Sequence, residues 1–387
     1  MDASILRLGF ACYWRVPASA TWSGTPWVLR SALSERIRLI DLGVRLPSTV
    51  ETLLKLGHVR LTSFGLSSVW EDSAVTDRIL GRQLRFAARE TRPDAVLQIQ
   101  DLAVFGEPYF TYQDLSYSAL IHLHDQGFEL EQFPGLSLRR LRAREERQRE
   151  VYERATGVLV FSDWLKELLV RQGLDHRKAH RIHPGANVDR FAGVDDPRVS
   201  QSGGEQSALS DRSHPPRLLF VGRDFHRKGG DLVVEAFIRL KREFADSASL
   251  VVAGPRRWPM KRPPPQGVRF LGDQSPAAVH GLMRSADLFV MPSRFEAFGI
   301  VFAEALSAGV PCVARRSFAM PEIVRDGVNG ALVETSSVTE LVSAMVRVLE
   351  DEALRNRVWE DRPLQRRYWS WDRAADEMVG LMYGESN

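Results

Sequence analysis

Two glutamates stand eight residues apart in the segment SRFEAFGIVFAEALSAGVPCVA, residues 293 to 314. The residues DLFVMPS before it have the pattern of a buried strand, and GIVFAEALSAG has that of a helix ending at Gly309. Glu296 is therefore expected on the loop at the carboxyl end of the strand, and Glu304 one to two turns into the helix. Because ionised carboxylates only accept hydrogen bonds, both suit the hydroxyl groups of a sugar and a ribose. For an isolated glutamate such as Glu304, the alternative is a cap or ion pair on a helix surface.

The start of this helix supplies hydrogen-bond donors. Phe298, Gly299 and Ile300 are expected in its first turn, where backbone amides lack partners within the helix. Free amides at a helix N-terminus attract anions. The segment therefore offers donors for a phosphate close to two carboxylate acceptors.

A second candidate site lies in LLFVGRDFHRKGGDLVVEAF. A buried strand over residues 218–221 ends at Gly222, Arg223 and Lys228 follow, and Gly229-Gly230 opens a helix. A glycine turn that enters a helix beside two cations favours phosphate binding. The segment matches neither the G-x4-G-K-[ST] phosphate loop nor the G-x-G-x-x-G dinucleotide fingerprint. A solvated surface turn is the alternative interpretation.

Strand-like and helix-like segments alternate along the chain, which predicts an α/β fold with parallel sheets covered on both faces. Residues 198–216, RVSQSGGEQSALSDRSHPP, have the composition of a linker. We therefore expect two doubly wound domains, residues 1–197 and 217–365. Residues 366–387 are expected to form a C-terminal helix that packs back on the N-terminal domain. Ligands of such sheets bind outside the carboxyl ends of the strands.

In combination these motifs resemble the retaining glycosyltransferases of family 4. The resemblance rests on VGRDFHRKGG, PSRFEAFGIVFAEALSAGVPCVA and PEIVRDGVNGALV, and extends to GVLVFSDWLKELLVRQG, HRIHPGANVDRF and YWSWDRAADEMVGLM. It covers most of residues 151 to 380, in the order expected for the family. It implies the GT-B fold, with two Rossmann-like domains, an interdomain cleft, an acceptor-binding N-terminal domain and a donor-binding C-terminal domain.

The resemblance implies roles for individual residues. Arg223 and Lys228 would bind the donor diphosphate, Glu296 would position the transferred sugar, and Glu304 would hold the ribose. The first three would be the catalytic residues. The implied donor-binding set is Gly24, Thr25, Gly222, Arg223, Lys228, Glu296, Phe298, Gly299, Ile300 and Glu304.

Two positions depart from the family pattern. The family often has a His-Asp pair after a strand of the first domain, whereas YFTYQDLS places Gln113 before Asp114. Gln113 and Asp114 are expected on the acceptor side, where Gln113 could hydrogen-bond a sugar hydroxyl but not act as an imidazole. The family's glycine pair before PEIV is replaced by Ala319-Met320.

The resemblance predicts a retaining hexosyltransferase. It would move a hexosyl-type sugar from a nucleotide diphosphate sugar to a hydroxyl acceptor (a glycan, a lipid or a small natural product), without a metal or another cofactor. One alternative is a non-catalytic module that binds nucleotide sugars. Another is a different GT-B enzyme, such as a sugar-nucleotide epimerase.

Composition and charge bear on the remaining questions of partners, metals and cellular location. The net charge is +3, and residues 139–154 mix seven arginines with four glutamates, as in a solvated helix, so nucleic acid is not an expected partner. His122 and His124 would form a metal pair only on a strand, since on a helix they point apart. Two cysteines in opposite halves and no long apolar stretch predict a cytoplasmic protein. Residues 254–265, GPRRWPMKRPPP, would aid peripheral contact with the inner face of a membrane.

Overall fold

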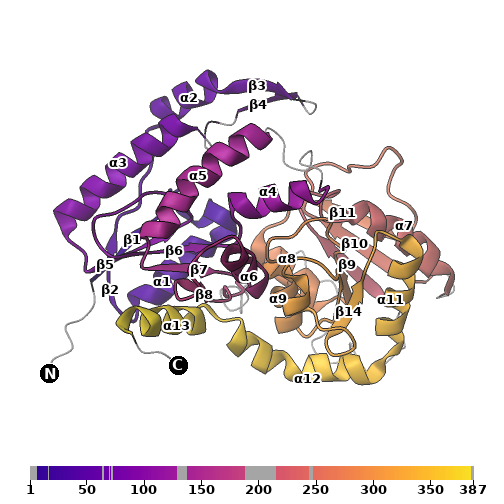
Figure 1. Cartoon of the computed structure of the whole chain (residues 1–387). Helices are drawn as coiled ribbons and strands as arrows, with labels where there is room; N and C mark the ends of the chain where they lie inside the picture. Colours follow the sequence, from indigo (N-terminus) through magenta and orange to yellow (C-terminus); the bar gives the residue numbers. More distant parts are fainter. Residues whose placement is uncertain are drawn as a thin grey trace. The chain divides into compact units, whose positions relative to one another are not determined.

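The chain folds into two compact units, residues 1–184 with 371–387 and residues 185–370. The computed structural model (Figure 1) describes residues 7–15, 17–62, 65–68, 70, 73–128, 137–187, 215–243 and 247–384. The expected domain boundary at residue 197 lies outside these residues, as does the expected linker 198–216 except for its last two. The units divide at Pro184, and the second unit continues past residue 365 to Ser370.

The first unit is built on a parallel six-stranded sheet, in the order β2-β1-β5-β6-β7-β8. Its strands are β1 (Arg7–Ala11), β2 (Arg38–Asp41), β5 (Ala95–Ile99), β6 (Tyr109–Gln113), β7 (Gly157–Val160) and β8 (Ala179–Arg181). β5, β6 and β7 are buried along their whole length, as expected for strands covered on both faces.

Helices cover this sheet. They are α1 (Thr25–Ser34), α2 (Ser48–Gly57), α3 (Ala74–Thr91), α4 (Tyr117–Asp125), α5 (Leu138–Arg154), α6 (Asp163–Arg171) and α13 (Trp371–Tyr383), with a 3₁₀ helix over Ala18–Gly24. A small antiparallel hairpin, β3 (Val59–Thr62) with β4 (Gly65–Ser68), lies apart from the main sheet. His122 and His124 lie on α4, so the strand arrangement that would pair them does not occur.

The second unit has another parallel six-stranded sheet, in the order β11-β10-β9-β12-β13-β14. Its strands are β9 (Arg217–Val221), β10 (Ser249–Ala253), β11 (Val268–Gly272), β12 (Leu288–Val290), β13 (Cys312–Arg315) and β14 (Gly330–Val333). Its helices are α7 (Gly230–Glu243), α8 (Pro276–Arg284), α9 (Ile300–Ser307), α10 (Met320–Ile323), α11 (Val338–Glu350) and α12 (Glu352–Tyr368). Two parallel α/β sheets confirm the predicted fold class.

Serine caps fix where several helices begin. The hydroxyls of Ser73, Ser116, Ser162, Ser275 and Ser337 each accept the backbone N–H three residues ahead. Each hydroxyl pairs one of the donors that a helix start leaves without an internal partner. Ser116 and Ser162 follow β6 and β7 closely, so they also set where the chain turns back from the carboxyl edge of the first sheet.

The C-terminal helix α13 belongs to the first unit. Its buried face consists of Trp371, Ala374, Ala375 and Met378. Arg36, just after α1, pairs with Asp372 at 3.0 Å and with Asp376 at 2.5 Å, and Arg373 donates to the carbonyl of His183 at 2.7 Å. Within the described residues, none of the helices combines the length and the apolar character needed to cross a membrane.

Candidate functional site

The predicted diphosphate and glutamate motifs lie at the point where the second sheet changes direction. β9 and β12 are neighbours in the sheet, but the chain continues from β9 to β10 on one side and from β12 to β13 on the other. The loops after β9 and β12 therefore leave the same sheet edge in opposite directions. In open α/β sheets this switch point is where ligands bind.

Close backbone approaches hold three loops together at this edge. Gly229 has a φ of +76°, and a Cβ on it would stand 2.6 Å from the carbonyl oxygen of Pro292. Gly254, after β10, has a φ of +117°, and its Cβ would stand 2.6 Å from the carbonyl carbon of Gly222. Only glycine combines this backbone conformation with this contact. The turn before α7 is thus packed against the loop after β12.

Two arginines tie the same loops by hydrogen bonds. Arg227 donates to the carbonyl of Phe295 at 3.2 Å and pairs with Asp224 at 2.7 Å. Arg294 makes a two-pronged contact with Asp231 on α7, with both nitrogen–oxygen distances at 2.7 Å. Planar guanidinium groups suit such paired contacts. Neither arginine was predicted from the sequence, although each lies within or next to a motif that carries the site.

Lys228 and Glu296 meet at this edge as an ion pair between Nζ and Oε2. The Glu296 side chain is 9% exposed and that of Lys228 16%. The Ser293 hydroxyl, 3.5 Å from Oε2, donates a further hydrogen bond to Glu296. The structure therefore brings together two of the three predicted catalytic residues, which stand 68 positions apart in the sequence. Lys228 is largely shielded from water and lies beside a carboxylate. The ammonium group can bind an anionic group of a ligand while the carboxylate accepts hydrogen bonds from its hydroxyl groups.

Arg223, the third predicted catalytic residue, is placed differently. It follows Gly222, its side chain is 75% exposed, and its Nε lies 3.3 Å from Oδ1 of Asp273. Among the residues that the structure describes, it contacts neither Lys228 nor Glu296 through a hydrogen bond or ion pair. Screening by water makes such an exposed pair weak, so Arg223 can exchange Asp273 for another anion at small cost.

The helix start differs by two residues from the prediction. α9 begins at Ile300, Gly299 is its N-cap with a φ of +95°, and Phe298 precedes the helix. The first turn therefore includes Ile300 but not Phe298, because the left-handed conformation at Gly299 ends the loop there. Phe298 is 3% exposed and packs edge-to-face on Trp369, with ring centroids 6.0 Å apart. Its side chain anchors the loop, and the backbone N–H of Phe302 donates to the carbonyl of Gly299 at 2.9 Å in the first turn of the helix.

Gly299 also protects the position of Glu296. A Cβ at Gly299 would stand 3.1 Å from Cγ of Glu296 and 2.8 Å from the ring of Phe302. Any side chain there would press on the carboxylate that pairs with Lys228. The glycine is thus required both by its φ and by its neighbours.

Glu304 lies on α9, half-buried, and accepts a hydrogen bond from the backbone N–H of Asn187. Burial raises the pKa of Glu304 to about 7, and the Asn187 amide opposes this shift. The carboxyl group therefore changes charge near neutral pH, and donors that favour its ionised form would lower its pKa. Hydroxyl groups of a ligand are such donors. Asn187 lies in HRIHPGANVDRF, a segment noted in the sequence but without an assigned role.

Gly24 and Thr25 lie in the first unit, at the carboxyl side of β1. Gly24 ends the 3₁₀ helix and is the N-cap of α1 with a φ of +88°, and Thr25 is the first residue of α1. The resemblance implies a small-residue loop at these two residues, and the structure has the start of helix α1 there, after the first strand. Their role toward the donor stays a prediction.

The acceptor-side role of Gln113 stays a prediction, and the structure shows where its side chain lies. Gln113 ends β6 and is fully buried, and its Nε2 donates to the hydroxyl of Tyr152. Its Nε2 is thus engaged in the interior, whereas its Oε1 is buried without a hydrogen-bond partner among the described residues. Asp114, the next residue, is half-buried and accepts from Nε2 of Gln100 at 3.4 Å. Asp114 remains the better candidate of the two.

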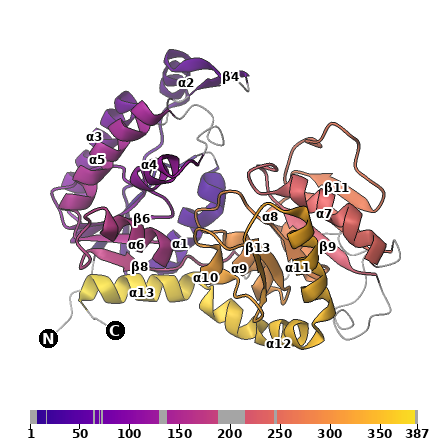
Figure 2. The ribbon, with the colours of Figure 1, turned by 45° about the vertical axis from the view of Figure 1, so that its right-hand side comes forward.

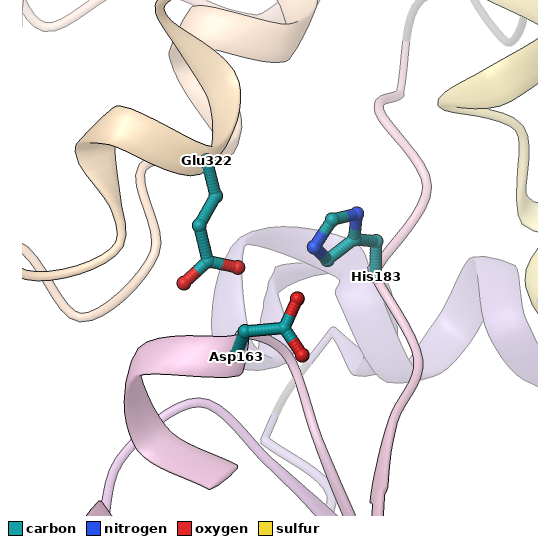
Figure 3. A group of neighbouring side chains, drawn as sticks. All are labelled: Asp163, His183 and Glu322. Atoms are coloured by element: carbon teal, nitrogen blue, oxygen red, sulfur yellow. The ribbon is translucent and has the colours of Figure 1, made fainter. Parts of the chain in front are cut away.

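Figure 3 shows three further side chains of metal-ligating type: Asp163, His183 and Glu322. Asp163 begins α6 and pairs with Arg181 at 3.4 Å, and His183 is buried after β8. Glu322 lies on α10 of the second unit. Because the three residues come from separate units, we assign no metal site to them.

Two family models match the chain. "Glycosyltransferase Family 4" matches residues 65–190, and "Glycosyl transferases group 1" matches residues 205–362. The second match contains Lys228, Glu296 and Glu304. The first match lies mostly in the first unit and ends six residues into the second, and the other match lies within the second unit.

Relatives with similar sequences are also named as glycosyltransferases. The chain is 29% identical over 237 residues to D-inositol 3-phosphate glycosyltransferase of Salinispora tropica, covering 57% of this chain and 48% of the relative. It is 26% identical over 328 residues to alpha-D-kanosaminyltransferase of Streptomyces kanamyceticus, covering 82% and 83%. The chain thus spans about half the length of the first relative and most of the second.

Solved structures share the fold. Sucrose-phosphate synthase from Thermosynechococcus elongatus superposes with a TM-score of 0.68 at 17% identity, covering 98% of both chains. WaaG, a glycosyltransferase of lipopolysaccharide biosynthesis, gives a TM-score of 0.64 at 19% identity, covering 96% of this chain and all of the other. At such identities the likeness concerns the fold alone.

Proposed function

Since this chain is a glycosyltransferase with the GT-B fold, we propose that it moves a hexosyl-type sugar from a nucleotide diphosphate sugar to a hydroxyl acceptor, with retention at the anomeric carbon. One observation carries the proposal: the ion pair between Lys228 and the buried Glu296 at the switch point of the second sheet. A cation for the diphosphate and a carboxylate for the sugar then stand side by side. The non-catalytic and epimerase alternatives are not favoured, since both family models that match describe transferases.

Lys228 is proposed to stabilise the departing diphosphate. When the bond from the anomeric carbon to the phosphate oxygen breaks, its electron pair stays on the diphosphate. A cation fixed beside that oxygen stabilises the growing charge more than it stabilises the bound donor. Lys228 is held between its own glycine turn and Glu296, so little reorganisation is needed. The amides at the start of α9 and the exposed Arg223 would share the remaining charge.

Glu296 is proposed to hold the transferred sugar by accepting hydrogen bonds from its hydroxyl groups. Glu296 forms an ion pair with Lys228, and carboxylate oxygens accept hydrogen bonds from hydroxyl groups. The acceptor oxygen would attack the anomeric carbon from the face that the diphosphate leaves. The acceptor's proton would pass to the leaving phosphate, which balances the charge without a separate base.

Glu304 is proposed to bind the ribose of the donor. Two ribose hydroxyls donating to its carboxylate would favour ionisation and offset the effect of burial on its pKa. Nucleotide binding should then release part of a proton near pH 7. No metal ion or other cofactor is needed in this scheme, because Lys228, Arg223 and a helix start supply the positive charge.

The proposal is tested with a panel of nucleotide sugars. Thermal shift identifies the donor, since a ligand at about 100 times its Kd stabilises by roughly 2.7 kcal/mol. Release of nucleotide diphosphate is then measured with and without acceptors from the three classes, in the presence of EDTA. We expect acceptor-dependent release that survives EDTA. Release that needs added Mg²⁺ or Mn²⁺, or that ignores every acceptor while the sugar is isomerised, would overturn the proposal.

A further inference from the structure

A cavity lined by arginines lies in the first unit, between α3 and α5 and the segment after β5. Its volume is about 450 Å³. Figures 1 and 2 both show α3 and α5 running side by side in this unit. The five arginines of the lining are Arg78, Arg85, Arg140, Arg144 and Arg147.

The spacing of the arginines explains why they face one another. Arg78 and Arg85 stand two turns apart on α3, and Arg140, Arg144 and Arg147 follow an i, i+4, i+7 pattern on α5. Each set therefore occupies one face of its helix. Between them the wall is formed by small residues, Ala74, Ala103 and Ala143 among them, so space remains for a ligand.

Two of the arginines are held in fixed positions by the protein. Arg144 pairs with Asp77 and donates to the hydroxyl of Tyr117 at 3.1 Å. Arg147 donates to the carbonyl of Asp101 at 2.9 Å and lies 3.4 Å from its carboxylate. Their guanidinium groups form a preorganised wall. Asp77 also forms an ion pair with Arg147, at 3.5 Å from Nε. The Asp77 carboxylate is thus shared between Arg144 and Arg147.

The positive charges of Arg78 and Arg85, the two cavity arginines of α3, are not neutralised by an ion pair within the described residues. Arg78 is exposed and Arg85 half-buried, and within the described part of the chain neither has a hydrogen-bond or ion-pair partner. Glu150, the other acid of the cavity, pairs with Arg154 at 3.4 Å. Arg78 and Arg85 therefore add positive charge to the lining that no ion pair within the described residues neutralises.

Gly81 gives Arg85 its place. A Cβ on Gly81 would stand 3.1 Å from Nη1 of Arg85, so the guanidinium lies against the bare backbone of its own helix. A glycine in the middle of α3 costs roughly 0.5–1 kcal/mol of helix stability relative to alanine. Its presence is explained if the position of the Arg85 charge matters.

From this geometry we propose that the cavity between α3 and α5 binds a phosphate group. Guanidinium forks match the oxygens of a phosphate and bind it by paired hydrogen bonds. Arg144 and Arg147 would form the preorganised side of the site, and Arg78 and Arg85 would close on the anion from α3. The site is separate from the Lys228–Glu296 pair, which belongs to the other unit, and it does not depend on the proposed function.

Binding is tested first with a soluble phosphomonoester. Calorimetric titration of glycerol 3-phosphate, with glycerol as the uncharged control, is carried out on the wild-type chain, on Arg78→Gln/Arg85→Gln and on Arg82→Gln/Arg89→Gln. The second pair removes two exposed arginines of α3 that do not line the cavity. We expect the cavity pair to lose about tenfold or more in affinity, the scale of hydrogen bonds to a charged group, and the control pair to keep it.

Further variants separate binding in this cavity from binding elsewhere on the chain. Lys228→Ala should leave glycerol 3-phosphate binding to the cavity unchanged, because the donor site is in the other unit. Gly81→Ala should weaken binding although it favours the helix. Equal losses in the cavity and control pairs would mean non-specific attraction, and loss in Lys228→Ala would place the phosphate at the donor site. Either result overturns the proposal.

A second arm distinguishes a free phosphate from a lipid headgroup. Sedimentation with vesicles of phosphatidylglycerol is compared with vesicles of phosphatidylcholine, using the same variants. If the phosphate belongs to a lipid, binding to phosphatidylglycerol falls in Arg78→Gln/Arg85→Gln and not in Arg82→Gln/Arg89→Gln. If it belongs to a soluble molecule, only the calorimetric experiment shows this difference. If neither experiment distinguishes the two pairs, the cavity is not a phosphate site.

Discussion

The carboxyl edges of the two sheets are built in different ways. In the second unit, loops after β9, β10 and β12 approach so closely that glycines are required, and a charged pair of Lys228 and Glu296 is held there. In the first unit, β6 ends in Gln113, a neutral side chain that is buried and bonded to Tyr152. A crowded, charged edge constrains residue types strongly. The edge of the first sheet is closed by contacts with the interior and constrains residue types less. A ligand of that edge is therefore harder to infer from the sequence.

The largest expected effect is that of Lys228→Ala on turnover. Removing one preorganised donor from a transition state costs on the order of 10²–10³ in rate. Arg223→Ala should cost clearly less, because Arg223 is exposed and paired with Asp273. Turnover at saturating donor and acceptor checks both variants, with Arg242→Ala, an exposed arginine in the last turn of α7, as the control. Near wild-type turnover in Lys228→Ala would mean that the diphosphate lies elsewhere.

Glu296→Ala is expected to lower turnover while leaving the affinity for the bare nucleotide diphosphate nearly intact. The carboxylate would contact the sugar, and its removal frees Lys228 for the phosphate. Steady-state kinetics and calorimetry on the same preparation check this division. A large loss of nucleotide affinity with normal turnover would mean that the roles of Glu296 and Glu304 are exchanged.

The close packing of the loops at the carboxyl edge of the second sheet can be disrupted by a substitution at Gly229. Gly229→Ala adds a Cβ 2.6 Å from the carbonyl oxygen of Pro292, at a φ of +76°. We expect it to lower the free energy of unfolding by about 1–3 kcal/mol. Gly327 has a φ of +71° but nothing within 4 Å of its Cβ position, so Gly327→Ala isolates the cost of the backbone alone. Equal losses in urea unfolding would show that the contact with Pro292 is unimportant.

Much of the fold and part of the site could be predicted from the sequence. Apolar runs such as AVLQIQ and RLLFVG became β5 and β9, since strands buried on both faces are continuously hydrophobic. No apolar run marks β2 (RLID) and β8 (AHR) in the sequence, because edge strands need few apolar residues. The sequence of α11 and the first turns of α12 has one continuous helical pattern, but the Asp351 carboxylate accepts the Leu354 N–H and so caps a new helix.

The contacts of the site were less predictable than its motifs. Sequence placed Lys228 and Glu296 at two strand ends, but only the sheet order makes those strands neighbours. The burial of Gln113 and the hydrogen bond from Asn187 to Glu304 depend on tertiary packing, which no local pattern records.

A smaller effect, on the free energy of unfolding, is expected from the ionisation of Glu304. Its pKa is about 7 in the folded chain against 4.5 for the exposed group, so the unfolded state ionises first. The free energy of unfolding should therefore fall as pH rises from about 4.5 to 7 and then level off. Glu304→Gln should remove this fall, which we expect to be about 1–2 kcal/mol because the side chain is only half-buried. Urea unfolding at pH 5 and pH 8 measures it, and identical pH profiles for both chains would contradict the assignment.

The placement of the donor is tested most directly by calorimetric titration of the nucleotide diphosphate identified by thermal shift. The titration is carried out on the wild-type chain and on single alanine variants from both units. Lys228→Ala and Glu304→Ala should weaken binding, the latter by about 1.5–3 kcal/mol, the scale of a hydrogen bond to a charged group. Asp114→Ala should leave the affinity unchanged. Weakened binding in Asp114→Ala, with normal binding in Lys228→Ala and Glu304→Ala, would contradict the placement of the donor at the switch point of the second sheet.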